Sequence, residues 1–239
     1  MANSYFKFKQ FVVHQDKAAM KVGTDGVLLG AWVNVGNAVN FLDVGTGTGL
    51  IALMLAQRNS NACVTAIDID KDAVSQASDN FAFSDWTERL KIVHNPLQEF
   101  AENNMEKFDH VVCNPPFFNN AYKSVNHSRN LARHTESLSF EDLIANAGRV
   151  SNSHGKLSVV LPFDAERVFI EIAEKYSYTP SRITRVRPTP HKDYVRTLIE
   201  LSKDAADGIV TNEIVIEDKG RHGYSDDYIA LTKTFYLKM

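Results

Sequence analysis

Residues 42–50, with the sequence LDVGTGTGL, place three glycines directly behind a short apolar run. The run predicts a strand at 40–44, and the apolar stretch GLIALMLAQR that follows predicts a buried helix. Gly45, Gly47 and Gly49 would permit a tight turn and let a ligand approach the backbone at the helix N-terminus. A simple strand-to-helix turn needs a single glycine, so this spacing favours a binding loop.

The remaining chain alternates between strand and helix patterns. Further strands are expected at 63–67, 90–93, 110–113, 156–161, 182–187 and 194–201. Helices are expected at 70–83, 139–150 and 164–176, with Asp70 and Ser139 as N-caps. This order predicts an α/β fold with a doubly wound, mostly parallel sheet of seven strands and an antiparallel terminal strand.

No shift in composition marks a linker, so we expect one domain spanning residues 1–239, with a core at 40–201 and a C-terminal extension at 202–239. The last eight residues, TKTFYLKM, have the pattern of a terminal strand.

The composition is that of a globular protein. Hydrophobic residues make up 44% of the chain, the formal net charge is −3, and no run of 18 apolar residues occurs. The charge excludes a uniformly basic nucleic-acid coat, so a polyanionic partner would have to meet a local patch. Cys63 and Cys113 lie in apolar runs without metal-ligand spacing, which indicates buried free thiols, no metal site and a soluble cytoplasmic protein.

Two carboxylates narrow the choice of ligand for the glycine loop. Asp43 precedes the glycines, where it would repel a pyrophosphate but suit a ligand with a cationic ammonium group. Asp68 ends the second strand and could accept hydrogen bonds from ribose hydroxyls, although it could also cap the next helix. The pattern G-x-G-x-x-A at 47–52 by itself also fits dinucleotides. A ribose and an amino-acid head without phosphate describe S-adenosyl-L-methionine.

With these residues, the segment 40–201 resembles the class I S-adenosylmethionine-dependent methyltransferases, which have a Rossmann-like fold. The resemblance implies that the two aspartates and the three glycines contact the cofactor. In that family an acidic residue after the third strand often contacts the cofactor's adenine amine, whereas this chain has HNPLQEF at 94–100. Asn95 or the backbone of Leu97 would have to substitute for it.

The fourth strand ends in NPPF, residues 114–117. Two successive prolines remove two backbone donors and lock φ, which holds Asn114 in an extended conformation. Because ligands of such sheets bind beyond the carboxyl ends of the strands, the motif would face the same crevice as the glycine loop. There the Asn114 side-chain oxygen and the Pro115 carbonyl could hold an exocyclic amine, with Phe117 stacked on a planar target. Taken alone, Asn-Pro-Pro could equally initiate a turn.

Behind a glycine loop, this tetrapeptide resembles the N-P-P-[FY] motif of amino-methyltransferases, which act on adenine N6, cytosine N4, guanine N2 or glutamine N5. The resemblance implies that Asn114, Pro115, Pro116 and Phe117 form the catalytic motif, with Asn114 also beside the cofactor.

The N-terminal stretch FKQFVVHQDKAAMKVGTDGVLLGAW leads directly into the first strand and leaves no room for a separate substrate domain. Together with NPPFF, ARHTESLSFEDLI, RVRPTP and FYLK it is similar to the bacterial tRNA adenine-N6 methyltransferases that modify position 37 in the anticodon loop of a valine isoacceptor. The resemblance implies that residues 1–39 pack by the cofactor site, with Lys21, Thr24 and Asp25 near its methionine part. Thr24 and Asp25 could instead cap a helix that starts at Gly26.

Binding of tRNA should leave basic clusters in spite of the net charge of −3. One cluster lies on the expected strands at 182–201 and comprises Arg182, Arg185, Arg187, Lys192 and Arg196. A second follows the N-P-P-F motif and comprises Lys123, Arg129 and Arg133, with Phe118 and Tyr122 as candidate stacking partners. Either cluster could be an ordinary solvated surface.

The sequence leaves two other functions open: methylation of another amine acceptor, in rRNA, DNA or a protein glutamine, and RNA binding without catalysis. It does not reveal the oligomeric state, with which a monomer is compatible.

Overall fold

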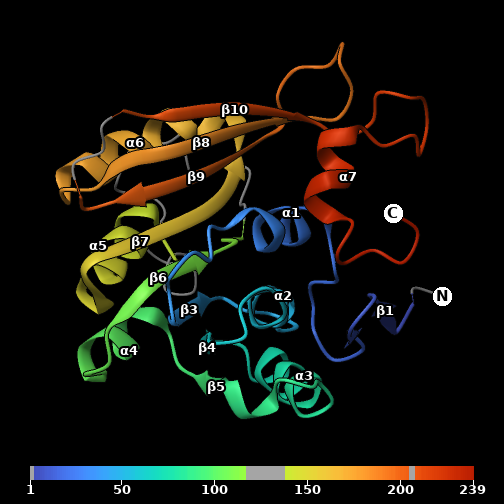
Figure 1. Cartoon of the computed structure of the whole chain (residues 1–239). Coiled ribbons are helices and arrows are strands. Elements are labelled where there is room, and N and C mark those ends of the chain that lie inside the picture. The colour runs from blue at the N-terminus through green and yellow to red at the C-terminus, as the bar shows by residue number, and fades with distance from the viewer. Residues whose placement is uncertain (1–2, 117–137, 205–207) are drawn as a thin grey trace, which may run out of the picture.

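The computed structural model describes residues 3–116, 138–204 and 208–239. Within these residues an eight-stranded sheet has the strand order β10-β8-β9-β7-β6-β3-β4-β5 (Figure 1). The strands are β3 (Asn40–Val44), β4 (Cys63–Asp68), β5 (Leu90–His94), β6 (Phe108–Cys113), β7 (Ser151–Pro162), β8 (Thr179–Arg187), β9 (Arg196–Ser202) and β10 (Val210–Val215). β9 runs antiparallel to both β7 and β8, and the other neighbours pair in parallel.

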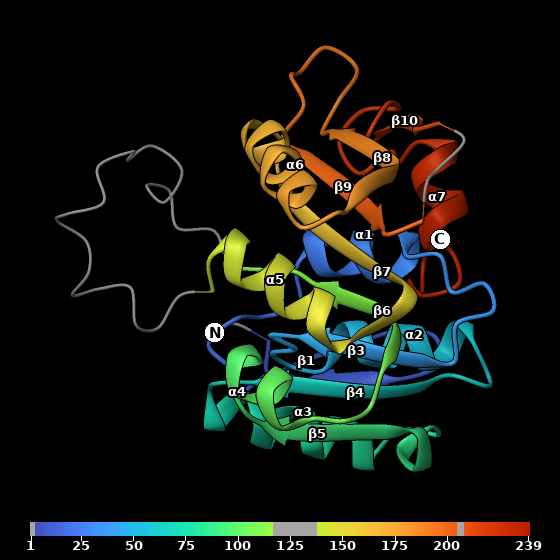
Figure 2. The same cartoon turned by 90° about the vertical axis from the view of Figure 1, so that its left-hand side faces the viewer.

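Helices cover both faces of the sheet. One face carries α4 (Leu97–Asn103), α5 (Phe140–Val150) and α6 (Glu166–Lys175) (Figures 1 and 2). The opposite face carries α1 (Thr24–Trp32), α2 (Leu50–Arg58), α3 (Lys71–Ala82) and α7 (Asp226–Thr232). A small hairpin of β1 (Tyr5–Lys7) and β2 (Val12–His14) lies beside α3, and the 3₁₀ turns η1 (Thr87–Arg89) and η2 (Phe163–Ala165) complete the described elements. The predicted doubly wound α/β fold is confirmed.

The sheet has one strand more than the sequence predicted. β10 comes from the C-terminal extension and pairs in parallel with β8 at the edge of the sheet. The first four of its six residues are exposed, so the strand lacks the apolar run by which a buried strand is recognised.

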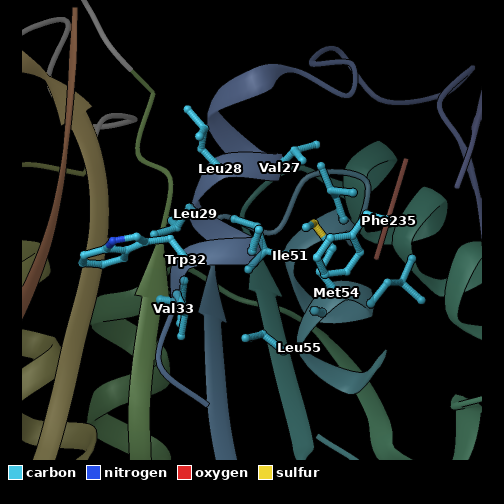
Figure 3. Close-up of a cluster of buried hydrophobic side chains, with 14 of the residues drawn as sticks. Val27, Leu28, Leu29, Trp32, Val33, Ile51, Met54, Leu55 and Phe235 are labelled. Carbon is cyan, nitrogen blue, oxygen red and sulfur yellow. The ribbon is translucent and has the colours of Figure 1, made fainter. Parts of the chain in front are cut away.

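The prediction of a strand at the C-terminus was wrong. The segment 232–239 finishes α7 and then continues in turns. Its aromatic side chains are used for packing instead. Phe235 is 1% exposed and lies in the cluster formed with α1 and α2 (Figure 3), and Tyr236 stacks on Phe8. Burial of an aromatic side chain of this size contributes about 2–3 kcal/mol to the free energy of unfolding.

The predicted helix starts are confirmed at two N-caps. The Asp70 side chain accepts a hydrogen bond from Asp72 N, and the Ser139 hydroxyl accepts one from Asp142 N. The expectation for the cysteines is half right, because Cys113 is buried whereas Cys63, the first residue of β4, is exposed.

Candidate active site

The carboxyl ends of β3 and β6 meet where the chain changes from one face of the sheet to the other. β3 leads into α2 on one face, and the chain after β6 returns to the sheet through α5 on the opposite face (Figure 2). Such a switch point opens a crevice at the sheet edge. A pocket of about 350 Å³ lies there. Its lining comprises Ala18, Ala19, Met20, Val44, Gly45, Gly47, Ile67, Asp68, Ile69, Asp70, Ala73, Asn95, Pro96, Leu97, Gln98, Cys113, Asn114, Pro115, Pro116, Leu138 and Asp142.

The three glycines of the turn have two different tasks. All three have positive φ: 67° at Gly45, 56° at Gly47 and 82° at Gly49. A Cβ at Gly45 or Gly47 would meet no described atom within 4 Å, so both leave space at the pocket wall. A Cβ at Gly49 would lie 2.5 Å from the ring of Phe81. Gly49 therefore permits close packing of the turn on α3, and the described lining of the pocket does not include it.

Asp43 is fully buried behind the glycine turn. Its Oδ2 accepts hydrogen bonds from the Thr46 hydroxyl at 2.6 Å and from Ala52 N at 3.2 Å. Its Oδ1 has no hydrogen-bond partner among the residues that the structure describes. Burial raises the pKa of Asp43 to about 7, and the nearby charge of Asp68 acts in the same direction. The group is thus a buried carboxyl with spare acceptor capacity and a proton that it can lose near neutral pH.

Asp68 lines the pocket and also shapes the turn. Its Oδ2 accepts a hydrogen bond from Gly47 N at 2.8 Å, and its Oδ1 accepts one from Asp70 N at 2.9 Å. The helix after it is capped by Asp70, so Asp68 is not the N-cap of α3. Each carboxylate oxygen can accept more than one hydrogen bond, so Asp68 remains able to bind a ligand hydroxyl.

The turn between β5 and α4 forms the far wall of the pocket. Asn95 and Leu97 line it, as do Pro96 and Gln98 between and beside them. Asn95 N donates to the carbonyl oxygen of Asp68 at 3.0 Å, which ties this turn to the end of β4. Asn95 and Leu97, which we proposed from the sequence as substitutes for the acidic residue that contacts the cofactor's adenine, therefore both line the pocket.

The N-P-P motif begins where β6 ends. Asn114, Pro115 and Pro116 all line the pocket, together with Cys113, whose thiol pKa is raised by burial. Asn114 Oδ1 is shielded from solvent and has no hydrogen-bond partner among the described residues. A buried amide oxygen without a partner is costly, which marks it as an acceptor available to a ligand. Phe117 lies outside the described residues.

Comparison with known proteins shows the family to which the chain belongs. Residues 22–167 match the family model described as methyltransferase small domain. The chain belongs to this family. It is 46% identical to the tRNA1(Val) (adenine(37)-N6)-methyltransferase of Flavobacterium psychrophilum over 98% of this chain and 100% of that one. It is also 46% identical to the enzyme of the same name from Parabacteroides distasonis, over 100% of both chains.

The fold itself recurs in solved structures. A protein from Agrobacterium tumefaciens described as a predicted O-methyltransferase superposes with a TM-score of 0.69 at 21% identity, covering 88% of this chain and 96% of that one. The resemblance of this chain to the class I methyltransferases is thereby confirmed at the level of fold and family.

The predicted cofactor residues of the N-terminal segment do not line the pocket of this family member. Lys21, Thr24 and Asp25 precede or begin α1, and no side chain caps that helix at its N-cap, Gly23. The capping alternative for Thr24 and Asp25 was therefore wrong. Asp25 instead forms a two-pronged ion pair with Arg196 Nε at 2.9 and 3.0 Å.

The arginines of the β8–β9 cluster are engaged within the protein. Arg185 pairs with Glu166 at 2.7 Å, and Arg187 pairs with Glu213 at 3.0 Å and lies over the ring of Tyr194. Arg182 reaches Glu200 and the carbonyl oxygen of Trp32. By contrast, the exposed Lys192 ammonium group makes no ion pair with any residue in the described part of the chain. The second cluster, Lys123, Arg129 and Arg133, with Phe118 and Tyr122, lies outside the described residues.

Several lining residues were missed by sequence reasoning. These are Ala18, Ala19, Met20, Val44, Ile67, Ile69, Asp70, Ala73, Pro96, Gln98, Cys113, Leu138 and Asp142. Ile69, Asp70 and Cys113 adjoin residues that were predicted, so their position after or at a strand end could have indicated them. The apolar and small residues at 18–20 carry no chemical signal of their own.

Among residues 3–116, 138–204 and 208–239 there is no group of three or more His, Cys, Asp or Glu side chains placed to hold a metal ion. The same residues contain no helix with the length and hydropathy needed to cross a membrane.

Proposed function

We propose that this chain transfers a methyl group from S-adenosyl-L-methionine to N6 of adenine 37 in the anticodon loop of the valine-1 tRNA. The observation that carries the proposal is one pocket in which the glycine turn and Asp68 meet Asn114 and Pro115. The substrate follows from relatives with that activity in their names, which match this chain at 46% identity over their whole length.

The residues of the pocket fit this cofactor. The space at Gly45 and Gly47 admits a ligand against the backbone, and Asp68 can accept hydrogen bonds from ribose hydroxyls. Asp43 lies behind the turn and outside the described lining of the pocket, where its charge, when deprotonated, would favour a cationic amino-acid head over a phosphate. Asn95 and Leu97 would hold the adenine. The bound cofactor would supply a methyl group on a positively charged sulfur, which leaves as the neutral thioether of S-adenosylhomocysteine when the amine nitrogen takes the methyl group. The nitrogen, cationic after the transfer, then releases one of its protons.

The chain's part in the chemistry is to hold the acceptor amine. The lone pair of an exocyclic amine is delocalised into the base, so the amine is a poor nucleophile. The Asn114 side-chain oxygen and the Pro115 carbonyl would each accept one N–H, which favours a pyramidal nitrogen with its lone pair directed at the methyl group. The orphaned Asn114 Oδ1 supplies the acceptor that this geometry requires. The rigid prolines keep it in place, and Phe117 would stack on the base.

The remaining assignments are part of the same proposal. Residues 1–239 act as one domain, since β10 from the C-terminal extension joins the central sheet and Phe8 near the N-terminus stacks on Tyr236. Lys21, Thr24 and Asp25 would approach the methionine part of the cofactor from the segment beside the pocket. The tRNA would contact Lys192 and the segment with Lys123, Arg129 and Arg133. Arg185 and Arg187 are weaker candidates for tRNA binding, because both already form ion pairs within the protein.

Incubation with methyl-labelled cofactor and separate pools of tRNA, rRNA, DNA and protein tests the proposal. We expect label in tRNA, recovered as N6-methyladenosine, and loss of that nucleoside at position 37 of the valine-1 tRNA in cells that lack the protein. Label confined to another pool would move the activity to that acceptor. Absence of both cofactor binding and label would favour a non-catalytic RNA-binding role.

A further inference from the structure

One wall of the pocket is a segment without regular secondary structure. Residues 15–23, which we call the N-terminal strap, connect β2 to α1. Ala18, Ala19 and Met20 of the strap line the pocket beside Ile69, Asp70 and Ala73. A wall of this kind has no helix or sheet ladder to hold its backbone, so its position depends on other contacts.

Buried side-chain amides provide those contacts. Gln15 Oε1 accepts a hydrogen bond from Val22 N at 2.9 Å, which closes the strap on itself. Gln76 Oε1, on α3, accepts one from Lys17 N at 2.8 Å. Asn80, one turn further along α3, brackets His14: its Oδ1 accepts from His14 N and its Nδ2 donates to the His14 carbonyl, both at 2.9 Å. Gln15 is 6% exposed, and Gln76 and Asn80 are each 1% exposed.

Asn80 also joins the end of β2, directly before the strap, to the glycine turn. Its Nδ2 donates a second hydrogen bond, at 2.8 Å, to the carbonyl oxygen of Thr48. The next residue, Gly49, packs against Phe81 of the same helix. The buried face of α3 therefore holds two walls of the pocket, the strap and the turn, in one fixed relation.

The chemistry of these residues argues for positioning rather than packing alone. Positions 76 and 80 are four apart and share one buried face of α3, where apolar side chains would fill the space without hydrogen-bond requirements. A buried amide is costly unless it is paired. The hydrogen bonds of Gln76 and Asn80 join backbone groups of three residues, of which Lys17 adjoins Ala18 and Thr48 adjoins Gly47 in the pocket lining, whereas His14 ends β2 just before the strap.

We infer that Gln76 and Asn80 are positioning residues that set the affinity for the cofactor, by holding the strap as a wall of the pocket beside the glycine turn. The inference rests on the proposed function, because it assumes S-adenosylmethionine as the ligand. Neither residue touches the reacting atoms, so both act through Lys17 N, His14 and Thr48.

The test compares three variants of the full chain in the absence of RNA. Gln76→Met keeps the length of the side chain but removes the acceptor for Lys17 N, whereas Gln76→Glu retains an acceptor. Lys17→Ala is the matched control, because it removes an exposed ion pair between the same strap and Asp79. The side chains of Lys17 and Asp79 are 42% and 45% exposed, and such exposed pairs contribute little to stability. Calorimetry measures the affinity for S-adenosylhomocysteine, and steady-state kinetics with tRNA give the cofactor KM and kcat.

We expect Gln76→Met to weaken S-adenosylhomocysteine binding and raise the cofactor KM by about tenfold, the loss typical of one buried hydrogen bond. The kcat at saturating cofactor should stay within about threefold, because the groups that hold the amine are untouched. Gln76→Glu should restore most of the affinity, and Lys17→Ala should change it by less than about twofold.

Three results would overturn the inference: wild-type affinity in Gln76→Met, a fall in its kcat with an unchanged KM, or an equal loss of affinity in Lys17→Ala. A wild-type protein that does not bind S-adenosylhomocysteine would contradict the proposed function, and the inference with it.

Hydrogen exchange on the wild-type protein needs no variant to fold. The amides of Lys17 and Val22 lie in an irregular segment but donate to buried side chains, so they should exchange slowly, and more slowly with S-adenosylhomocysteine bound. Fast exchange at both amides with and without the ligand would overturn the inference.

Discussion

The amino and carboxyl ends of the neighbouring strands β3 and β6 both carry polar side chains, but these side chains differ in their hydrogen-bond partners. Toward the carboxyl end, Asp43 Oδ1 and Asn114 Oδ1 are buried without a partner in the described structure. Toward the amino end lies a second pocket of about 250 Å³, whose lining includes Asp109 and His110. There Asp109 accepts from Val39 N, Asn40 N and the Asn152 side chain, and His110 bonds the Ser158 hydroxyl at 2.8 Å.

The two ends therefore differ in whether their buried polar atoms have hydrogen-bond partners within the described chain. Buried polar atoms are nearly always paired in a folded chain, so those left unpaired at a pocket indicate a ligand. Hydrogen bonds within the chain hold the amino end together, and the unpaired oxygens support our proposal that binding and chemistry take place toward the carboxyl end.

The largest expected effect is the loss of methyl transfer in the variant Asn114→Ala. The variant for comparison is Ser158→Ala, at the amino end of the strands. Loss of one directed hydrogen bond to the reacting group should lower the single-turnover rate by about 10²–10³-fold, while affinity for S-adenosylhomocysteine changes little. Ser158→Ala should do the reverse: full activity, but a free energy of unfolding lower by about 1–3 kcal/mol, because it strands the buried His110 nitrogen. Equal activities in the two variants would remove the distinction between the ends.

Within the glycine turn, Gly49→Ala and Gly47→Ala should differ in stability. A Cβ at Gly49 would lie 2.5 Å from the Phe81 ring and adds the strain of φ 82°, so we expect a loss of about 3 kcal/mol. At Gly47, φ is 56° and an added Cβ would have no described atom within 4 Å, so backbone strain alone should lower the free energy of unfolding by about 1 kcal/mol. The alanine methyl group should also weaken cofactor binding, because it would project into the space at the pocket wall. Denaturant unfolding with calorimetric binding measures both. A Gly47 variant less stable than the Gly49 variant would contradict the two tasks assigned to these glycines.

His110 should make the amino-end network sensitive to acid. Burial lowers its pKa from 6.5 to about 4, so the folded state takes up the proton less readily than the unfolded chain. The stability that follows is complete above pH 6.5 and is lost as the pH falls toward 4. Between pH 7 and pH 5 the wild type should lose about 2 kcal/mol more than His110→Gln, as measured by urea unfolding. If the free energy of unfolding changed with pH in the same way in the wild type and in His110→Gln, burial would not protect the His110 imidazole from protonation in the folded state.

Asp43 should make cofactor affinity depend on pH, the smallest of these effects. With its pKa raised to about 7, Asp43 must lose a proton before it can attract the ligand's ammonium group. Affinity for S-adenosylhomocysteine should therefore fall as the pH drops below 7, by up to about tenfold per unit. Asp43→Asn should bind less tightly at pH 8 and show a flatter profile, because an amide does not titrate. If the affinity of the wild type and of Asp43→Asn changed with pH by the same slope, a group other than Asp43 would be responsible for the pH dependence.

The sequence was sufficient for the parts of the fold and site that depend on local pattern. The glycine turn, the strands at its flanks, the caps at Asp70 and Ser139, and Asn114 at the end of β6 all follow from neighbours in the chain. Of the predicted cofactor and catalytic residues, Gly45, Gly47, Asp68, Asn95, Leu97, Asn114, Pro115 and Pro116 line one pocket.

What the sequence did not reveal depends on distant contacts. Asp25 looked like a helix cap or a cofactor ligand because Arg196, its partner, lies 171 residues away. β10 shows no apolar pattern because it is an edge strand, and the aromatic run after Thr232 serves packing on α1 and α2 instead of a sheet. The role of Gln76 and Asn80 likewise appears only when the strap lies against α3.

The central claim is that Asn114 and Pro115 hold the exocyclic amine of adenine 37. Its most direct test is methyl transfer to two valine-1 tRNAs that differ at position 37, one with adenine and one with purine, which lacks only that amine. We predict labelled N6-methyladenosine in the first and no label in the second, although both tRNAs bind the protein with similar affinity. Equal labelling of the two tRNAs would contradict the account.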